Sequence, residues 1–498
     1  MTTGVLLPVF ALMTSLLASV VIFALPERMH GVRVLINLGA AGLKLLLVGV
    51  MIWGIAQGRE YEVAFEMLPG LRFVLRADAL SMLFAGLSGV LWLLTTIYAV
   101  GYLEDSPNRS RFFGFFSLCV ASTTGVALAG NLFTFFLFYE MLTLSTYPLV
   151  VHRGTEKALK AGRNYIIYTL TGGAVLLLGI AWLHGLVGDL PFQAGGHFAD
   201  VEEALHGPLT VIFILLIAGL GVKAALVPLH GWLPQAMVAP APVSALLHAV
   251  AVVKAGAFGI VRVVFEVYGV SAAHALGLLS GLAVVAAFTI VYGSVRALYQ
   301  VDLKKRLAFS TISQVSYIVL GLCLLGPVGV AGGLVHLVHQ GIMKITLFFC
   351  AGNYAETLGI HRIDELDGAG RRMPATSVAF TLGAFGMIGA PPLAGFITKW
   401  KMGSGALTVG MDWVVVVLVV SSLLNAAYFL PVVHRLWFAE QRTPWPQERC
   451  WGRLETSAWL IWPPMVTTVF LVLAGLLAAM PFSPLNWAGL IVMREVAL

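Results

Sequence analysis

Charged side chains are scarce in this chain of 498 residues: Asp, Glu, Lys and Arg make up 11% of it, whereas hydrophobic residues make up 59%. This scarcity, together with a mean hydropathy of +0.91, excludes a soluble globular protein. Apolar runs of about 18 residues or more recur, each long enough to cross a bilayer as a helix. The short alternating strands of a membrane barrel are lacking. The sequence therefore predicts an all-α polytopic membrane protein.

Cysteine is also scarce, and recognisable redox motifs are missing with it. The four cysteines, Cys119, Cys323, Cys350 and Cys450, show no CxxC spacing, which argues against an iron–sulfur cluster, a zinc site or a disulfide framework. No segment carries a nucleotide, flavin or quinone-binding motif. We therefore expect no cofactor and no metal, and we expect no catalytic activity from the chain alone.

The apolar runs predict fourteen membrane-spanning helices. They cover about residues 4–25, 34–56, 79–101, 112–130, 131–151, 164–186, 208–227, 242–266, 272–296, 303–325, 328–352, 375–400, 412–436 and 457–480. The first run lacks a basic start and a small-residue cleavage site, so we interpret it as a retained span and not as a signal peptide.

The basic residues in loops and at span ends support this number. With both termini outside, 19 Lys and Arg residues face inward and only 6 face outward, in line with the cytoplasmic excess of positive charge in membrane proteins. The acidic segment from Asp200 to His206 falls on the outer side. We therefore predict an integral protein of a bacterial or archaeal cytoplasmic (inner) membrane, with both termini outside.

Few ionisable residues lie inside the predicted spans. They are one carboxylate, Glu140, and five lysines, Lys44, Lys223, Lys254, Lys344 and Lys399. A charge at the bilayer centre costs at least about 2.5–3.5 kcal/mol, so such residues are functional candidates by default. Burial disfavours the charged form of a lysine, whereas a neighbouring carboxylate favours it. The partner of each lysine therefore decides whether that lysine holds a proton.

Proline and glycine interrupt two of the spans. Four prolines between residues 228 and 242 follow Lys223, and the segment GAPPLAGFITKWK (389–401) contains Lys399. Proline removes a backbone donor and clashes with the preceding turn, and carbonyls freed at membrane depth are tolerated only beside protein or water. Matching breaks in two halves of a chain are typical of inverted-repeat transporters. Spans four to eight and nine to thirteen would form the repeats.

Five segments together resemble a known family. They read FLFYEMLTLSTYPLV, KAALVPLHGWLPQAMVAPAPVSALLHAVAVVKAG, QVDLKKRLAFSTISQVSYI, HLVHQGIMKITLFFCAG and GAPPLAGFITKWK. From about Asp78 to Arg435 the chain resembles the antiporter-like proton-pumping subunits of respiratory complex I and the homologous large, D-type subunits of Mrp-type Na⁺/H⁺ antiporters. The resemblance implies fourteen helices with two inverted five-helix repeats and broken helices 7 and 12. The expected domains are 1–111, 112–268, 269–440 and 441–498.

The resemblance also implies a set of proton-transfer residues, which are Glu140, Lys223, Lys254, His248, His336, His339, Lys344 and Lys399. Glu140 is similar to the glutamate of the fifth helix that pairs with the lysine of the seventh, here Lys223. Lys254 is similar to the central lysine of the eighth helix, with His248 nearby. His336, His339 and Lys344 resemble the connecting group of the eleventh helix. Lys399 is similar to the lysine of the twelfth, a position where some relatives carry glutamate.

Several of these residues also have a plainer interpretation. Glu140 is suited to a structural ion pair, and His248 to a hydrogen-bonded core histidine. Lys223 and Lys254 lie too far from the basic loops to snorkel easily. The two histidines of the eleventh helix are three residues apart on one face, but a metal site would need further ligands.

Three more charged residues are interpreted as structural. Lys44, alone in the second span, is expected to face lipid or to hold helices together. Asp78 and Asp302 precede predicted helices and are expected to cap them, because a carboxylate satisfies free backbone amides at a helix start.

The sequence predicts a proton-translocating, cation/H⁺ antiporter-like subunit of a multisubunit complex. Its expected partners are other integral membrane subunits, protons and the lipid bilayer, with no nucleic acid. Buried lysines repel Na⁺, so the charged residues favour protons, and the exchange of Na⁺ or another cation stays open. The alternative is an energy-coupling subunit of a redox or inorganic-carbon-uptake complex, for example NADH:quinone oxidoreductase-like or hydrogenase-like, without antiport of its own. The long lateral helix of the longest complex I member is not expected here.

Overall fold

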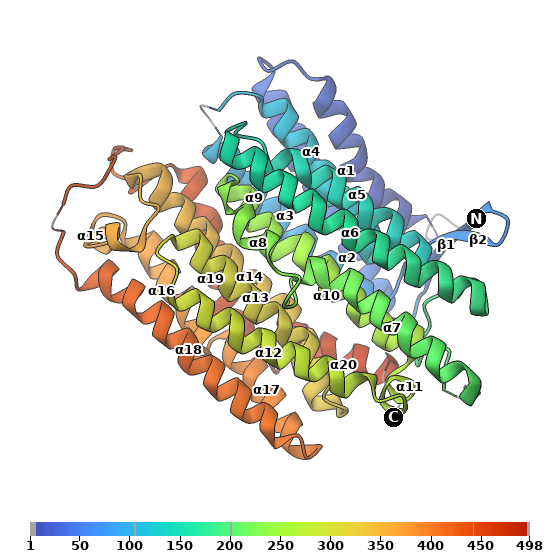
Figure 1. Ribbon diagram of the computed structural model, residues 1–498. Coiled ribbons are helices and arrows are strands. Elements are labelled where there is room, and N and C mark those ends of the chain that lie inside the picture. Colours follow the sequence, from blue (N-terminus) through green and yellow to red (C-terminus); the bar gives the residue numbers. More distant parts are fainter. Residues whose placement is uncertain (1–5, 104–105, 200–201, 442, 496–498) are drawn as a thin grey trace.

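The computed structural model describes residues 6–103, 106–199, 202–441 and 443–495. Asp200 and Arg442, which enter the predicted charge distribution, lie outside these residues. Within them the chain forms a bundle of long helices that lie roughly side by side, with a short hairpin of strands at one end (Figure 1).

The elements follow one another along the chain in two halves. The first half contains α1 (Leu7–Ala24), α2 (His30–Ala56), β1 (Tyr61–Leu68), β2 (Leu71–Ala77), α3 (Ala79–Tyr102), α4 (Arg109–Leu128), α5 (Leu132–Val150), α6 (Glu156–Val187), α7 (Glu203–Ala224), α8 (Trp232–Gln235), η1 (Ala236–Val238), α9 (Ala241–Ala245), η2 (Leu246–Val250), α10 (Val252–Arg262) and η3 (Val263–Tyr268). The second half contains α11 (Val270–Ala275), α12 (Leu278–Leu298), α13 (Leu303–Leu322), α14 (Pro327–Leu358), η4 (Ile363–Glu365), α15 (Ala369–Arg372), α16 (Pro374–Ile388), α17 (Ala394–Thr408), α18 (Asp412–Trp437), α19 (Ala458–Leu476) and α20 (Pro484–Glu495).

In the described residues, 11 helices are long and apolar enough to cross a membrane, and each falls on a predicted span. The other three predicted spans fall on segments of different character. The segment from α9 to η3 contains two π-helical stretches, α13 begins with a basic turn, and α16 is separated from α17 by a proline-containing break. The predicted polytopic helical membrane protein is confirmed. The count of fourteen spans, the inverted repeats and the broken helices stay predictions.

Side-chain caps define where several of these helices begin. Asp78 accepts a hydrogen bond from the backbone N–H of Ser81 at 2.6 Å, and Asp302 accepts one from that of Lys305 at 2.8 Å. Each cap satisfies an amide that the helix leaves free at its first turn. The two predicted caps are therefore confirmed.

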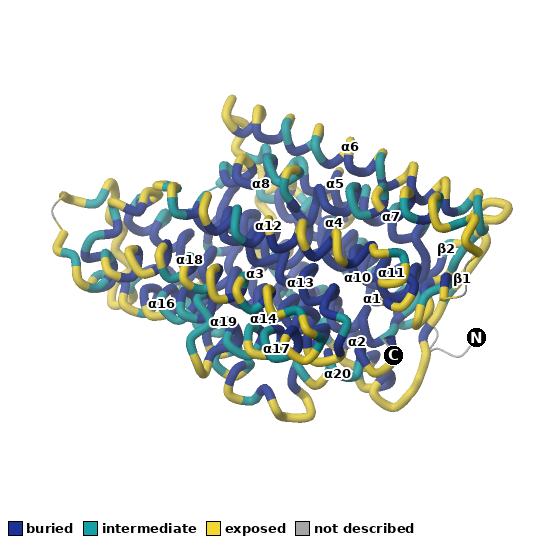
Figure 2. Tube along the Cα trace, turned by 60° about the horizontal axis from the view of Figure 1, so that its bottom comes forward, coloured by how far each residue is buried: buried dark blue, intermediate teal, exposed yellow. Residues whose placement is uncertain are grey.

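Helix α14 is the buried axis of the bundle. All residues of an 18-residue apolar stretch of α14 are buried, whereas only 28% of the residues in the corresponding stretch of α2 are. It packs against α3, α13, α16, α17, α19 and α20. Figure 2 shows the buried segments concentrated at the centre, with exposed positions along outer helices such as α6 and α18. Polar groups on α14 must therefore find partners inside the protein.

The hairpin of β1 and β2 is an addition to the predicted all-α fold. Its strands are antiparallel, with Tyr61 opposite Ala77, and Gly70 takes a positive φ of 78° in the turn, which glycine adopts without strain. Leu75 bridges to Ala129, so the hairpin covers the loop between α4 and α5. The sequence signal was the turn dipeptide Pro69–Gly70 between two segments that are short beside the apolar runs.

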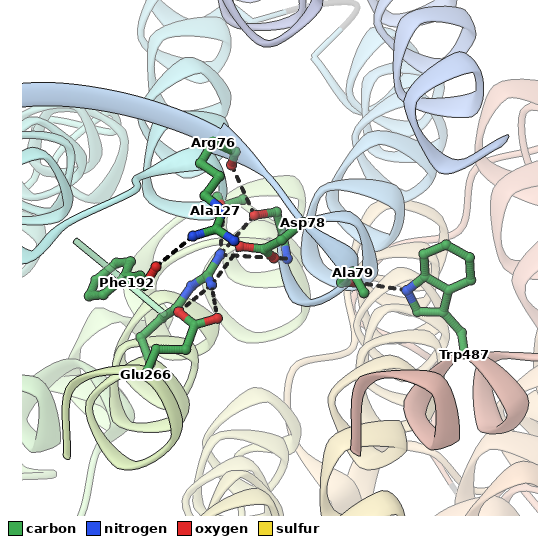
Figure 3. Close-up of polar contacts among 9 residues, drawn as sticks. Arg76, Asp78, Ala79, Ala127, Phe192, Glu266 and Trp487 are labelled. Carbon is green, nitrogen blue, oxygen red and sulfur yellow. Dashed lines mark hydrogen bonds and ion pairs between the residues drawn. The ribbon is translucent and has the colours of Figure 1, made fainter. Parts of the chain in front are cut away.

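A buried ion cluster joins α3 to α10 and η3. The fully buried Arg262 places Nη1 2.8 Å from Asp78 Oδ2 and also pairs with Glu266, and its Nη2 donates to Ser81 Oγ at 2.7 Å. Figure 3 shows Asp78 and Glu266 converging on one guanidinium group. Nearby, Trp487 on α20 donates to the carbonyl of Ala79 at 2.8 Å. The sequence counts Arg262 only as an outward charge, but the structure buries it between two carboxylates.

Replacing Arg262 by Met should destabilise the protein, because Asp78 and Glu266 would stay buried without their counter-charge. Removing one partner of a buried ion pair costs about 3–5 kcal/mol. We expect less folded protein and a lower midpoint when detergent-solubilised protein is heated and followed by size-exclusion chromatography. The control Arg59→Met removes an exposed arginine and should leave the midpoint unchanged. Equal midpoints for both variants would contradict this role.

Candidate functional site

Glu140 and Lys223 form an ion pair between α5 and α7. Lys223 Nζ lies 3.9 Å from Glu140 Oε1 and also donates to the carbonyl of Tyr139, above whose ring it sits 3.2 Å from the centroid. The Lys223 side chain is 0% exposed and that of Glu140 is 19% exposed. At 3.9 Å the two groups are in ionic contact but not hydrogen-bonded to each other, and Glu140 Oε1 has no hydrogen-bond partner among the described residues.

Glycines on α6 create the space for this pair. A Cβ at Gly173 would lie 2.4 Å from Glu140 Oε1, and one at Gly172 would lie 2.7 Å from a methyl of Val222. Because neither position has a side chain, α6 packs closely over both Glu140 and the last turn of α7. Lys223 lies in that last turn, where the negative end of the helix dipole favours an ammonium.

Lys254 connects α10 to the central helix. Its Nζ donates to the carbonyl of Leu337 on α14 at 2.8 Å. A Cβ at Gly256 would lie 2.3 Å from the backbone N of Ala224, so α10 packs directly on the end of α7. The structure therefore brings Lys223 and Lys254 to two touching segments.

The two histidines of α14 face α13 and α17. The ring of His336 lies 5.2 Å from that of Tyr317, whose ring centroid lies 5.8 Å from Lys399 Nζ. His339 Nδ1 lies 3.0 Å from Thr398 Oγ1, next to Lys399. One hydrogen bond therefore joins α14 to α17 directly, and a second route runs through the ring of Tyr317 on α13.

Lys399 closes the break between α16 and α17. Its Nζ donates to the carbonyls of Met387 at 3.1 Å and Ile388 at 2.7 Å, and to Ser422 Oγ at 2.8 Å. These carbonyls end α16 and have no continuing helix to accept from. Lys399 is only partly buried and lines a pocket of about 560 Å³ beside α18. It therefore lies at the side of the bundle, next to α18.

Lys344 on α14 and His248 on η2 have further partners of their own. Lys344 Nζ donates to the carbonyl of Leu307 at 3.2 Å and to Ser310 Oγ on α13. The ring of His248 stacks on Phe348 at 4.6 Å. Lys344 therefore contacts α13 from the face of α14 that also carries His336, and His248 packs against α14 from η2.

The sequence interpretation missed uncharged polar residues and left open whether Lys44 faces lipid or holds helices together. Gln314, Tyr317 and Gln340 are buried beside the histidines with polar side-chain atoms that lack a partner among the described residues. Gln and Tyr carry no charge, so hydropathy alone did not select them. Lys44 is fully buried and does not face lipid. Only Lys223, of the five lysines inside the predicted spans, lies in an ion pair within the described part of the chain.

Comparisons with protein families match most of the chain. Residues 129–425 match the family described as "NADH:quinone oxidoreductase/Mrp antiporter, TM". Residues 70–113 match "NADH-Ubiquinone oxidoreductase (complex I), chain 5 N-terminus".

Two curated proteins illustrate the range of relatives. The NADH-quinone oxidoreductase subunit N of Desulforudis audaxviator is 34% identical over 439 residues, which is 85% of this chain and 82% of the relative. A Na⁺/H⁺ antiporter subunit of Bacillus subtilis is 27% identical over 489 residues, 96% of this chain and 94% of the relative.

Solved structures share the fold along the whole chain. A chain of the Mrp complex from Dietzia sp. DQ12-45-1b is similar with a TM-score of 0.86 and 24% identity, covering 100% of this chain and 98% of the other. A chain of an archaeal membrane-bound sulfane sulfur reductase gives the same TM-score and identity, covering 100% and 99%. The chain therefore belongs to the family of transmembrane subunits shared by NADH:quinone oxidoreductases and Mrp antiporters.

Proposed function

We propose that this chain carries protons across the membrane as an antiporter-like subunit of a multisubunit membrane complex. The observation that carries the proposal is the row of buried amines from Lys223 through Lys254 to Lys399, with one carboxylate, Glu140, at its start. A lysine held by carbonyls and hydroxyls can accept and release a proton with little structural change, because the neutral amine fits the space that the ammonium occupies.

The Glu140–Lys223 pair is the proposed switch. While the pair is closed, the carboxylate favours a charged Lys223. When it opens, Lys223 loses its counter-charge and its proton is driven toward Lys254, on the segment that packs on the end of α7. From Lys254 the proton passes to the histidines of α14 and on to Lys399. Glu140 thus acts as a local electrostatic bias on a chain of exchangeable protons.

Water is the proposed carrier between these side chains. His336, Gln314 and Gln340 each have side-chain nitrogen or oxygen atoms that are buried and lack a protein partner within the described residues. Buried polar atoms are normally satisfied by protein or by ordered water. Water at these atoms would join α13, α14 and α17 into one hydrated path.

The architectural predictions belong to the same proposal. They comprise fourteen spans, domains at 1–111, 112–268, 269–440 and 441–498, both termini outside, and inverted repeats with broken helices 7 and 12. Support comes from two matching interruptions, since α7 ends at Ala224 before short helices, and α16 ends at Ile388 before α17. A lysine lies at each interruption, Lys223 at the first and Lys399 at the second.

Neutral variants of the row should abolish transport while leaving assembly intact. In Glu140→Gln the switch loses its charge, and in Lys254→Met the central amine is replaced by an apolar chain of similar length. Inside-out vesicles loaded with Na⁺ or K⁺ and diluted into medium without that cation should take up protons as the cation leaves. We expect this proton uptake, followed with a pH-sensitive dye, to fall by about tenfold or more.

The control for this experiment is Lys160→Met, which removes an exposed lysine of α6 and should transport normally. Assembly is checked by the yield of co-purifying subunits. Normal transport in a fully assembled Lys254→Met complex would refute the proposed path.

The second candidate is an energy-coupling subunit of a redox complex. It is favoured by the relatives named as subunits N and L of NADH-quinone oxidoreductases, the latter 32% identical over 475 residues in Mycobacterium tuberculosis. The same row of lysines would then work without cation exchange of its own.

Purification of the tagged chain from native membranes separates the two candidates. For the antiporter we expect small hydrophobic subunits alone, since no redox chemistry is needed. Co-purification of iron–sulfur, flavin or nickel subunits, identified by mass spectrometry, would favour the redox complex. A soluble zinc protein would favour inorganic-carbon uptake.

A further inference from the structure

Lys44 on α2 is buried as deeply as the lysines of the row. It is 1% exposed, although the outer face of α2 is largely uncovered. Its Nζ donates to Thr124 Oγ1 on α4 at 2.6 Å and to Ser15 Oγ on α1 at 2.8 Å. It also lies 4.7 Å from the ring centroid of Trp92 on α3. Four helices therefore enclose one amine.

A ladder of polar pairs joins Lys44 to one end of the bundle. On α4 the hydroxyl residues Ser110, Ser117 and Thr124 are spaced by seven residues and share one face. Each has a partner on α2: Arg33 donates to Ser110, Ser117 donates to Asn37 at 3.0 Å, and Lys44 donates to Thr124. The three pairs span about 20 Å along the helix.

The ladder begins at an exposed carboxylate. Glu27, whose side chain is 49% exposed, accepts hydrogen bonds from the backbone N–H groups of Arg109 and Ser110 at 3.0 and 2.9 Å. It also lies 3.9 Å from Arg33 Nη1. The predicted topology puts this loop on the inner side of the membrane.

Beyond Lys44, unpaired polar atoms continue toward α14. Ser88, Trp92 and Thr96 lie four residues apart on α3, and each has a buried side-chain atom without a partner among the described residues. Leu87, the residue before Ser88 on α3, lies close to Gly341 on α14 and Ala249 on η2. A Cβ at Gly341 would lie 3.1 Å from a methyl of Leu87 and 3.1 Å from the carbonyl of Ala249.

The chain neighbours at this junction are again unpaired polar residues. Gln340 precedes Gly341 and His248 precedes Ala249, and both have all their side-chain nitrogen and oxygen atoms buried without a partner in the described chain. Gln340 lies four residues from both His336 and Lys344, on the same face of α14. Unpaired polar atoms thus lie both on α3, beside Lys44, and on α14, and these two helices pack against each other.

We infer that Lys44 is a further proton-carrying residue, fed from the Glu27 end through the α2–α4 ladder and delivering to α14 through the α3 face. The inference rests on the proposed proton transport and adds a second entry to it. A purely structural role would need only a fixed hydrogen-bond donor at this position. A carrier must also release its proton.

Two variants of Lys44 distinguish these roles in the assembled complex. Lys44→Met removes the amine, and Lys44→Arg keeps the charge and the donors but cannot release a proton. We expect both to lower dye-reported proton uptake by about tenfold. Leu46→Met, at a lipid-facing position of the same helix, should transport normally. Assembly is followed by the co-purifying subunits.

The outcomes separate this inference from the proposed function. Normal uptake in Lys44→Met, or loss in Lys44→Met with normal uptake in Lys44→Arg, would overturn the carrier role while Lys254→Met still fails. Normal uptake in Lys254→Met would instead overturn the proposed function itself. If Lys44→Met does not assemble, Thr124→Val tests the same contact: a loss of about fivefold supports the role, and an unchanged rate overturns it.

Discussion

The fold depends on one electrostatic constraint: four lysines are buried in a low-dielectric bundle and a fifth, Lys399, is partly buried, whereas a single carboxylate pairs with one of the five within the described residues. Charge inside a protein must be paired or hydrogen-bonded. Here backbone carbonyls and hydroxyls supply the partners, as the carbonyl of Leu337 does for Lys254 and those of Met387 and Ile388 do for Lys399. Such partners tolerate a neutral amine as well as an ammonium, which a fixed carboxylate does not.

Helix α14 makes this arrangement possible. It is buried along its length, contacts both halves of the bundle, and carries His336, His339 and Lys344 toward different neighbours. The close approach of α10 to α7 at Gly256 brings the segments that carry Lys223 and Lys254 together, and Lys254 contacts α14 through the carbonyl of Leu337. Packing by small residues thus sets the spacing of the charged groups, and the charged groups explain why the glycines lie where they do.

Hydropathy and charge identified the long helices and the buried ionisable residues because both signals are strong over about 20 residues. These two signals could not decide in which direction a buried side chain points or which group it contacts. Lys344 turns toward α13 and Lys399 toward the side of the bundle because of local contacts with Ser310 and Ser422. Lys44 has no charged neighbour in the sequence, so its enclosure by α1, α3 and α4 is visible only in three dimensions. The hairpin and α20 were missed because short amphipathic segments are outweighed by apolar runs.

The central claim is that Lys254 transfers protons and is not merely a fixed charge. The most direct measurement is proton uptake by the assembled complex carrying Lys254→Arg. This substitution preserves a positive donor for the Leu337 carbonyl, but a guanidinium does not give up its proton in a protein. The account predicts that uptake is lost while the subunits still co-purify. Uptake at the rate of the unmodified complex would contradict it.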